Sequence, residues 1–142
     1  MIKTKIKNIS LINLRSFSDV RGSLSVAEIK KELPFAVKRV FFIHNVKKSA
    51  ERACHASKVQ REVLFCLNGS FKVDIDDGFN KQMIVLAGPA RGLYIGKNLW
   101  RRLYDFSKDC IILALCDTEY IANDHITDYK EFLKIARKKN KQ

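Results

Sequence analysis

Most of the fold information in this chain lies in the segment RACHASKVQRE, residues 52–62, and in the glycine that follows at Gly69. Within the segment, His55 and Ser57 stand two residues apart and Glu62 follows five residues later. A divalent first-row metal ion needs three or four N, O or S donors, and His55 and Glu62 supply only two. The segment therefore predicts a pocket without a metal, in which His55 is the side chain that titrates near neutral pH.

The spacing of His55, Glu62 and Gly69 resembles the cupin metal motif, which reads H-x-H, three or four residues, E, six residues and G. Ser57 stands at the position of the second histidine, and Arg101 stands where a later cupin motif supplies a third. A guanidinium keeps its proton and cannot become a metal ligand. The resemblance implies a cupin jelly-roll barrel, and we expect it to hold no metal and no other cofactor.

Runs rich in Val, Ile, Phe and Leu recur along the chain between turn residues, which is typical of an all-β fold. The clearest runs are 37–46, 63–67, 70–75, 83–86, 92–95 and 110–116. Asn68-Gly69 predicts a type I′ turn that pairs the strands on its two sides, and Asp77-Gly78 predicts the next reversal. The alternating stretch 3–14 is expected to pair either within its own chain or with the sheet of a neighbouring chain.

Only the C-terminus has a helical pattern. Asp128 can cap a helix with Glu131 three residues later, and one face then carries Tyr129, Phe132, Leu133 and Ala136. The chain shows no internal repeat and no linker. We therefore expect a single cupin domain over residues 1–142, with a short C-terminal α-helix packed on the outside of the barrel.

The net charge of +12, from 27 Lys and Arg against 15 Asp and Glu, predicts an anionic partner. A membrane is not expected, because no apolar segment is long enough to span a bilayer and the N-terminus lacks the core of a signal peptide. Nucleic acid is not expected either, because a binding face needs exposed aromatic rings among basic residues. The candidates Phe41, Phe42, Phe65 and Phe71 lie in runs that should be buried. Charge alone does not choose among nucleic acid, a phosphorylated small molecule and a membrane surface.

The cysteines have no C-x-x-C spacing, and they are Cys54, Cys66, Cys110 and Cys116. The last three lie in apolar runs, where a thiol acts as a small buried hydrophobe. This use of cysteine predicts a reducing compartment and a cytoplasmic protein.

Motifs along nearly the whole chain resemble those of the bacterial dTDP-sugar 3,4-ketoisomerases. They are RGSL (21–24), LPF (33–35), KRVF (38–41), RxxHA (52–56), GSF (69–71) with DDG (76–78), GLYIG (92–96) with WR (100–101), and DY (128–129) with EFL (131–133). The resemblance implies a metal-free homodimer that exchanges N-terminal strands and converts dTDP-4-keto-6-deoxyglucose into a 3-keto sugar. It also implies that the product supplies an aminotransferase that makes 3-amino-3,6-dideoxy sugars for surface glycans such as lipopolysaccharide.

The chemistry of that reaction makes His55 the expected base. A C3 hydrogen beside a C4 ketone is acidic because its removal gives an enediolate, so one base and a few cationic donors suffice. Family members carry a second histidine where this chain has Ser57. Either His55 serves both carbons from one face, or Tyr94, Arg101 or a water on Ser57 takes the second role.

Arg39 and Arg52 are the candidates for the diphosphate, because a guanidinium binds phosphate oxygens in a bidentate manner, and Lys58 is a further binding cation. Arg21 and Arg101 are expected to steer the configuration at C4, for which both the gluco and the galacto product remain open.

Tyr94 is the candidate for stacking on thymine. Glu62 either contacts the base edge or is a strand residue facing solvent, and Trp100 either touches the sugar or fills the core. His44 and His125 have no supporting motif, so we expect them to be structural.

A second function stays open from the sequence. The missing imidazole at Ser57 also fits a non-catalytic cupin that binds a nucleotide sugar as a sensor or regulator. Such a protein would bind the dTDP-sugar without exchanging its C3 hydrogen.

Overall fold

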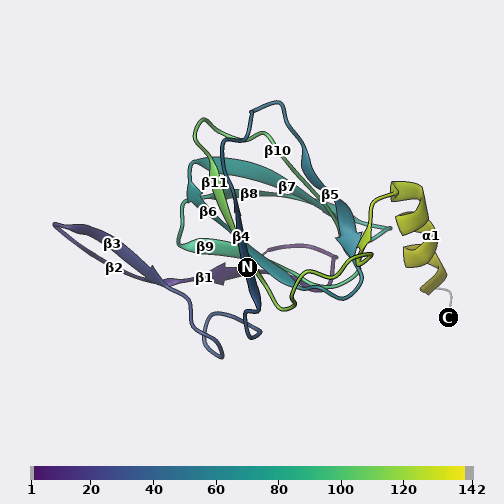
Figure 1. Ribbon diagram of the computed structural model, residues 1–142, viewed down its shortest axis with the longest axis horizontal. Coiled ribbons are helices and arrows are strands. Elements are labelled where there is room, and N and C mark those ends of the chain that lie inside the picture. The colour runs from purple at the N-terminus through teal and green to yellow at the C-terminus, as the bar shows by residue number, and fades with distance from the viewer. Residues whose placement is uncertain (1, 140–142) are drawn as a thin grey trace.

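The computed structural model describes residues 2–139 and consists of two antiparallel five-stranded sheets that face each other (Figure 1). The first sheet has the order β1-β9-β6-β11-β4 and the second has the order β12-β5-β10-β7-β8. The elements are β1 (Ile9–Asn13), β2 (Arg15–Asp19), β3 (Gly22–Val26), β4 (Arg39–Ile43), β5 (Arg52–Ser57), β6 (Glu62–Asn68), β7 (Ser70–Asp76), β8 (Lys81–Ala87), β9 (Arg91–Ile95), β10 (Trp100–Tyr104), β11 (Ile111–Cys116), β12 (His125–Ile126) and α1 (Tyr129–Lys139).

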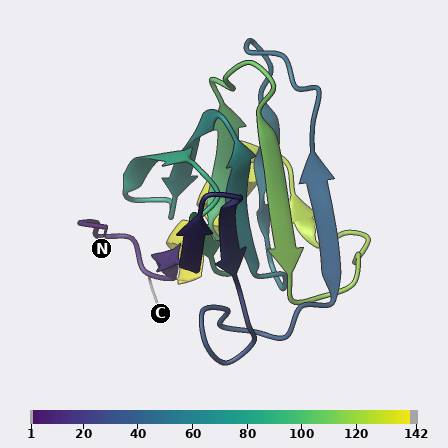
Figure 2. The same ribbon diagram turned by 90° about the vertical axis from the view of Figure 1, so that its left-hand side faces the viewer.

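The predicted all-β fold with one short C-terminal helix is confirmed. The two sheets form a sandwich, and the barrel implied by the cupin resemblance is not closed. Each predicted apolar run coincides with a strand, because each has one face or both turned into the protein. At the edge of the first sheet, β4 lies beside β11 (Figure 2).

The predicted hairpin at Asn68-Gly69 is wrong. The turn is present, and Gly69 adopts a φ of 80°, but β6 pairs with β9 and β11 whereas β7 pairs with β8 and β10. The Asn68 side chain donates to the carbonyl of Asp109 at 2.8 Å, and Ser107 crowds Gly69, so the turn is held against the 105–110 loop. The chain crosses there from one sheet to the other. The Asp77-Gly78 reversal does join β7 to β8 in one antiparallel hairpin.

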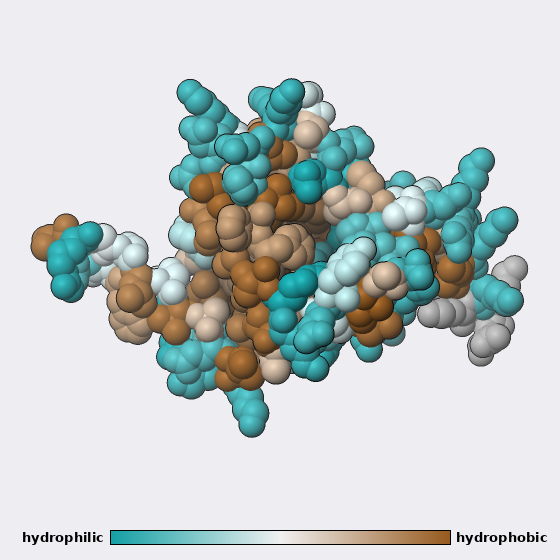
Figure 3. Space-filling view, viewed as in Figure 1, coloured by the Kyte–Doolittle hydropathy of each residue, from teal (hydrophilic) through white to brown (hydrophobic). Residues whose placement is uncertain are grey.

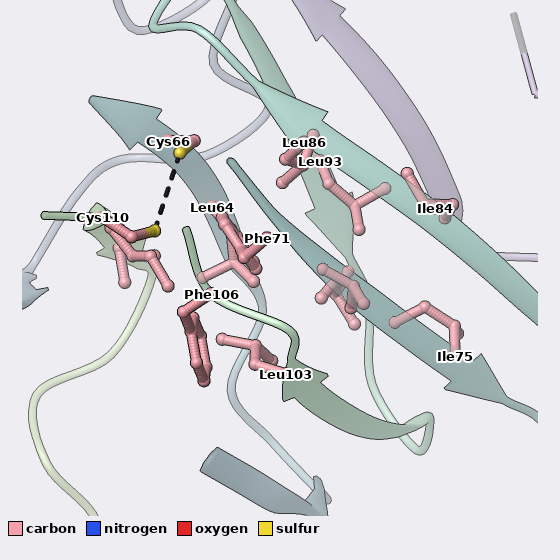
Figure 4. Packing of buried hydrophobic residues seen from close by; sticks show 14 of the residues in the cluster. Leu64, Cys66, Phe71, Ile75, Ile84, Leu86, Leu93, Leu103, Phe106 and Cys110 are labelled. Atoms are coloured by element: carbon pink, nitrogen blue, oxygen red, sulfur yellow. Dashed lines mark hydrogen bonds between the residues drawn. The ribbon is translucent and has the colours of Figure 1, made fainter. Parts of the chain in front are cut away.

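Apolar side chains from both sheets fill most of the space between them (Figure 4). Leu64 and Leu93 of the first sheet meet Phe71 and Leu103 of the second, and burying each such side chain contributes about 1.5–3 kcal/mol. Cys66, Cys110 and Cys116 are buried as predicted, and all four cysteines are free. This apolar core holds the sheets together and leaves the end where β6 begins for polar side chains.

Helix α1 covers the outer face of the second sheet. The Asp128 carboxylate accepts the backbone N–H groups of Lys130 and Glu131 at 2.9 and 3.3 Å, so the predicted cap is confirmed. The predicted apolar face is confirmed as well, with Phe132 buried against Ala56 of β5. No helix among residues 2–139 is long and apolar enough to cross a membrane.

The outer edge of the first sheet departs from the sequence prediction at Phe42. Phe65 and Phe71 are buried and Phe41 is half-buried, but Phe42 is 63% exposed. Phe42 lies on β4, an edge strand with no further strand beside it among the described residues. β4 carries apolar side chains on both of its faces, but only the face with Phe41 contacts the core, so Phe42 on the other face is left exposed.

Candidate active site

Three neighbouring strands of the second sheet place four polar side chains in one row. In the register, His125 of β12 lies opposite Ser57 of β5, and His55 of β5 lies opposite Arg101 of β10. Opposite residues of antiparallel strands, and residues two apart along a strand, share one face. The alternate residues Ala56 and Ile126 pack against α1, so the row lies on the opposite face of the sheet, with Ser57 and Arg101 buried and His125 exposed at the edge strand.

A β-bulge directs His55 into the sandwich. Along β10, Arg101 lies opposite His55 but Arg102 lies opposite Ala53, so Cys54 is the extra residue on β5. Ala53 and Cys54 adopt φ angles of 68° and 51°, a left-handed backbone region that residues other than glycine rarely occupy. Such strained backbone is characteristic of functional sites, where it fixes the direction of a side chain.

Arg101 is fully buried and pairs with Glu62, which reaches it from β6 of the opposite sheet. Its Nη1 lies 2.5 Å from Glu62 Oε1, and its Nη2 donates to the carbonyl of Leu99 at 3.1 Å. Glu62 is only 4% exposed, which excludes the alternative that it faces solvent. A divalent cation does not fit here, because the one carboxylate is occupied by a guanidinium. Within residues 2–139, no three His, Cys, Asp or Glu side chains are grouped to hold a metal.

A second guanidinium joins the same network. Arg39 of β4 donates through Nη2 to Gln60 Oε1 at 2.5 Å, and Gln60 Nε2 donates to Glu62 at 3.2 Å. Four buried side-chain atoms of the described residues lack a hydrogen-bond partner within the protein, namely Arg39 Nη1, Arg101 Nε, Ser57 Oγ and Thr118 Oγ1. An unpaired buried polar atom costs about 1–3 kcal/mol. Arg101 and Ser57 lie beside His55, and Arg39 is linked to Arg101 through Gln60 and Glu62, which marks this end of the sandwich as a site for a polar ligand.

His55 is neutral at physiological pH. Burial lowers its pKa to about 4, and the nearby positive charge of Arg101 and the imidazole of His125 act in the same direction. A neutral imidazole accepts a proton, so His55 has the state that a general base requires.

His125 is the residue of this site that sequence reasoning missed. Its ring stacks on that of His55, with centroids 3.9 Å apart and planes 12° apart. Nothing in the local sequence of His125 signals this contact, because it depends on the register between β12 and β5.

Tyr94 and Trp100 lie outside this row. Tyr94 is on the outer face of the first sheet, packed with Phe35 at a centroid distance of 6.5 Å. Trp100 is on the outer face of the second sheet and meets Tyr129 of α1 edge-on at 5.2 Å. Trp100 therefore packs between the second sheet and α1, and it does not fill the core between the two sheets.

The remaining predicted cations are on the surface. Arg52 and Lys58 are exposed at the two ends of β5, on either side of His55 and Ser57. Arg21 lies at the tip of the β2–β3 hairpin, is 87% exposed and pairs with Asp19 at 2.6 Å. The hairpin projects away from the sandwich, so Arg21 does not reach the site of its own chain (Figure 1).

Comparison with known proteins identifies the family. The model of the WxcM-like, C-terminal family (FdtA) matches residues 7–137. The chain belongs to this family. It is 42% identical over 130 residues to the TDP-4-oxo-6-deoxy-alpha-D-glucose-3,4-oxoisomerase of Aneurinibacillus thermoaerophilus, covering 92% of this chain and 94% of that protein.

Solved structures agree with the family assignment. The TDP-quinovose 3,4-ketoisomerase WlaRB of Campylobacter jejuni superposes with a TM-score of 0.87 at 42% identity, covering 91% of this chain and 99% of that one. A histidine-to-asparagine mutant of the 3,4-ketoisomerase QdtA of Thermoanaerobacterium thermosaccharolyticum, in complex with TDP-4-keto-6-deoxyglucose, gives a TM-score of 0.91 at 35% identity, covering 94% and 96%. Both relatives thus share the whole fold of the FdtA-like chain.

Proposed function

We propose that this FdtA-like protein is a 3,4-ketoisomerase that converts dTDP-4-keto-6-deoxyglucose into the 3-keto sugar beside His55. The observation that carries the proposal is the neutral, half-buried imidazole of His55 beside the Arg101 guanidinium, whose Nε has no partner. The relatives that match over almost their full length are named for this activity.

The reaction begins when neutral His55 takes the proton from C3. The electron pair moves into a C3–C4 double bond, and negative charge develops on the oxygen at C4. Arg101 lies opposite His55 in the register, and its unpartnered Nε is available to this oxyanion. The proton of the C3 hydroxyl passes to the oxygen at C4, which leaves the negative charge on the oxygen at C3. His55 then returns its proton to C4 as the oxygen at C3 becomes the new ketone.

The dTDP moiety needs cations next to this site. Arg39 carries an unpartnered buried Nη1, and Arg52 and Lys58 flank the row on β5, so we assign the diphosphate to these three. Glu62 is assigned to holding Arg101 and not to the base edge, since its Oε1 is occupied. Tyr94 and Trp100 face away from His55, and we assign them packing roles.

We also propose that the chain is a single domain and that two chains form a homodimer by exchanging their N-terminal strands. In the described chain, β2 and β3 pair only with each other, and their Phe17 and Leu24 are 62% and 58% exposed. Hydrophobic surface gathers on this hairpin and on the central part of the same face (Figure 3). Exchange of hairpins would bury these side chains and bring Arg21 to the partner's site, where it would act on the C4 configuration.

Light scattering tests the dimer. Arg21→Ala protein alone should form product with an altered C4 configuration. Mixing it with inactive His55→Asn protein then tests the shared site, because mixed dimers contain one site with both native residues and should restore the wild-type configuration in part of the product. A monomer in solution, or a mixture whose product has the same configuration as that of Arg21→Ala alone, would contradict the exchange.

NMR in D2O tests the proposed reaction directly. Incubating dTDP-4-keto-6-deoxyglucose with the protein should replace the C3 hydrogen by deuterium and produce a 3-keto sugar whose C4 coupling reports its configuration. A sensor would bind the sugar nucleotide with no exchange of its C3 hydrogen.

The free cysteines fit a reducing compartment, so we place the enzyme in the cytoplasm. Its product would supply an aminotransferase of surface-glycan synthesis.

A further inference from the structure

The position of His125 is fixed by its two neighbours in the chain. Asp124 is buried, and its carboxylate accepts the backbone N–H groups of Lys58, Val59 and Gln60 at 3.0, 2.8 and 3.1 Å. Ile126 on the other side is buried between β5 and α1. These contacts hold the two-residue strand β12 along β5 and place the exposed side chain of His125 where its ring stacks on that of His55.

The two histidines and Ser57 form one small group. His125 lies opposite Ser57 in the register, and its ring covers His55 at 3.9 Å. Side chains that are directly opposite in an antiparallel pair lie about as close as residues two apart on one strand. An imidazole on β12 is therefore as near to the reacting region as an imidazole at position 57 of β5 would be.

We propose that His125 is the second proton-carrying residue of this site and moves the oxygen-bound proton while His55 moves the carbon-bound one. The inference rests on the proposed isomerase function. As an imidazolium, His125 gives a proton to the oxygen at C4 while His55 removes the proton from C3. His125 then takes the proton of the C3 hydroxyl as His55 protonates C4, so both histidines end in their starting states.

The other groups around the row are less suited to this step. Arg101 keeps its proton at all accessible pH values, and Glu62 is held in an ion pair by it. The Ser57 hydroxyl does not titrate near neutrality, and Tyr94 lies on the far side of the first sheet. An imidazole both donates and accepts a proton in this range.

A pair of variants separates proton transfer from shielding. His125→Phe keeps a flat ring over His55 but carries no proton, and His125→Gln keeps hydrogen bonding without a titrating group. Both should lower kcat about 10²-fold, the lower end for general acid–base catalysis, with TDP affinity and thermal stability close to wild type. The control is His44→Phe just after β4, an exposed histidine that contacts the ring of Phe42 at a centroid distance of 5.6 Å, which should leave kcat unchanged.

The decisive measurement is rescue. Adding Ser57→His to His125→Phe restores an imidazole beside His55 and should recover at least a tenth of the wild-type kcat. The acid limb of kcat/KM should also move to higher pH in His125→Phe, because His125 lowers the pKa of His55. If both His125 variants kept more than half of kcat, or if Ser57→His gave no rescue in a folded double variant, the proposal would be overturned. An inactive wild-type protein would instead refute the isomerase function itself, and this inference with it.

Discussion

The buried pair of Arg101 and Glu62 gives the most quantitative prediction. Glu62→Gln keeps the size of the side chain and an oxygen that accepts a hydrogen bond, but it removes the charge that compensates a fully buried guanidinium. We expect this single change to destabilise the protein strongly, because the Arg101 charge would then lie between two sheets with no counter-ion.

The magnitude follows from the geometry. Two unit charges about 4 Å apart attract by roughly 4 kcal/mol at an effective dielectric constant near 20. Removing one partner of a buried pair typically costs about 3–5 kcal/mol. The remaining amide oxygen still accepts from Arg101, so the lower value of about 3 kcal/mol applies, which corresponds to a fall in Tm of roughly 6–12 °C for a chain of this size.

Urea denaturation and thermal melts at one fixed protein concentration measure the loss. The matched control is Glu51→Gln, the same chemical change in a surface carboxylate that accepts a hydrogen bond from Arg102 Nη1 at 2.6 Å. An exposed pair contributes about 0–1 kcal/mol, so the control should barely shift the midpoint. A loss of less than about 1 kcal/mol in Glu62→Gln, equal to the control, would show that water reaches Arg101 and would refute the buried network.

Three further predictions concern activity. Isomerisation should survive EDTA, because Glu62 is paired with Arg101; loss of activity that one added divalent ion restores would show the reverse. His55→Asn should lower kcat by about 10²–10⁴ while TDP binding measured by calorimetry changes little, and a variant that keeps most of its kcat would remove His55 from the mechanism. Arg52→Ala should raise KM, with a loss of about 1.5–3 kcal/mol in binding, and high salt should weaken wild-type affinity. An unchanged KM would make Arg39 the next diphosphate contact to test.

The strands that could be predicted from sequence are those with apolar faces in the core. β6 reads EVLFCLN and β11 reads IILALC, and both were found to within a few residues. β10 reads WRRLY and β2 reads RSFSD, in which charged residues hide the alternation. The Asn68-Gly69 turn was recognised but its partners were not, because a dipeptide fixes a reversal and does not fix whether the chain stays in one sheet.

The site was predictable as far as one motif reached. The segment around His55 and Ser57, together with Arg101, predicts three members of the row that the structure brings together. Arg39 was expected from its chemistry, and the structure adds its link to Glu62 through Gln60. His125 was not predictable, because a two-residue strand has no periodicity and its contact is set by tertiary register.

The order of the strands explains how such a site tolerates the loss of a histidine. β12, β5 and β10 are neighbours, so Ser57 has His125 beside it on β12, and His55 has Arg101 beside it on β10. A side chain from β12 can therefore contact His55 as well as a side chain from β5 can. A linear motif records only the neighbours along the strand, so a chain whose motif lacks one histidine can still present two imidazoles to a sugar. In this chain the row across the three strands reads His125, Ser57 with His55, and Arg101, so two imidazoles lie side by side although the linear motif contains only one.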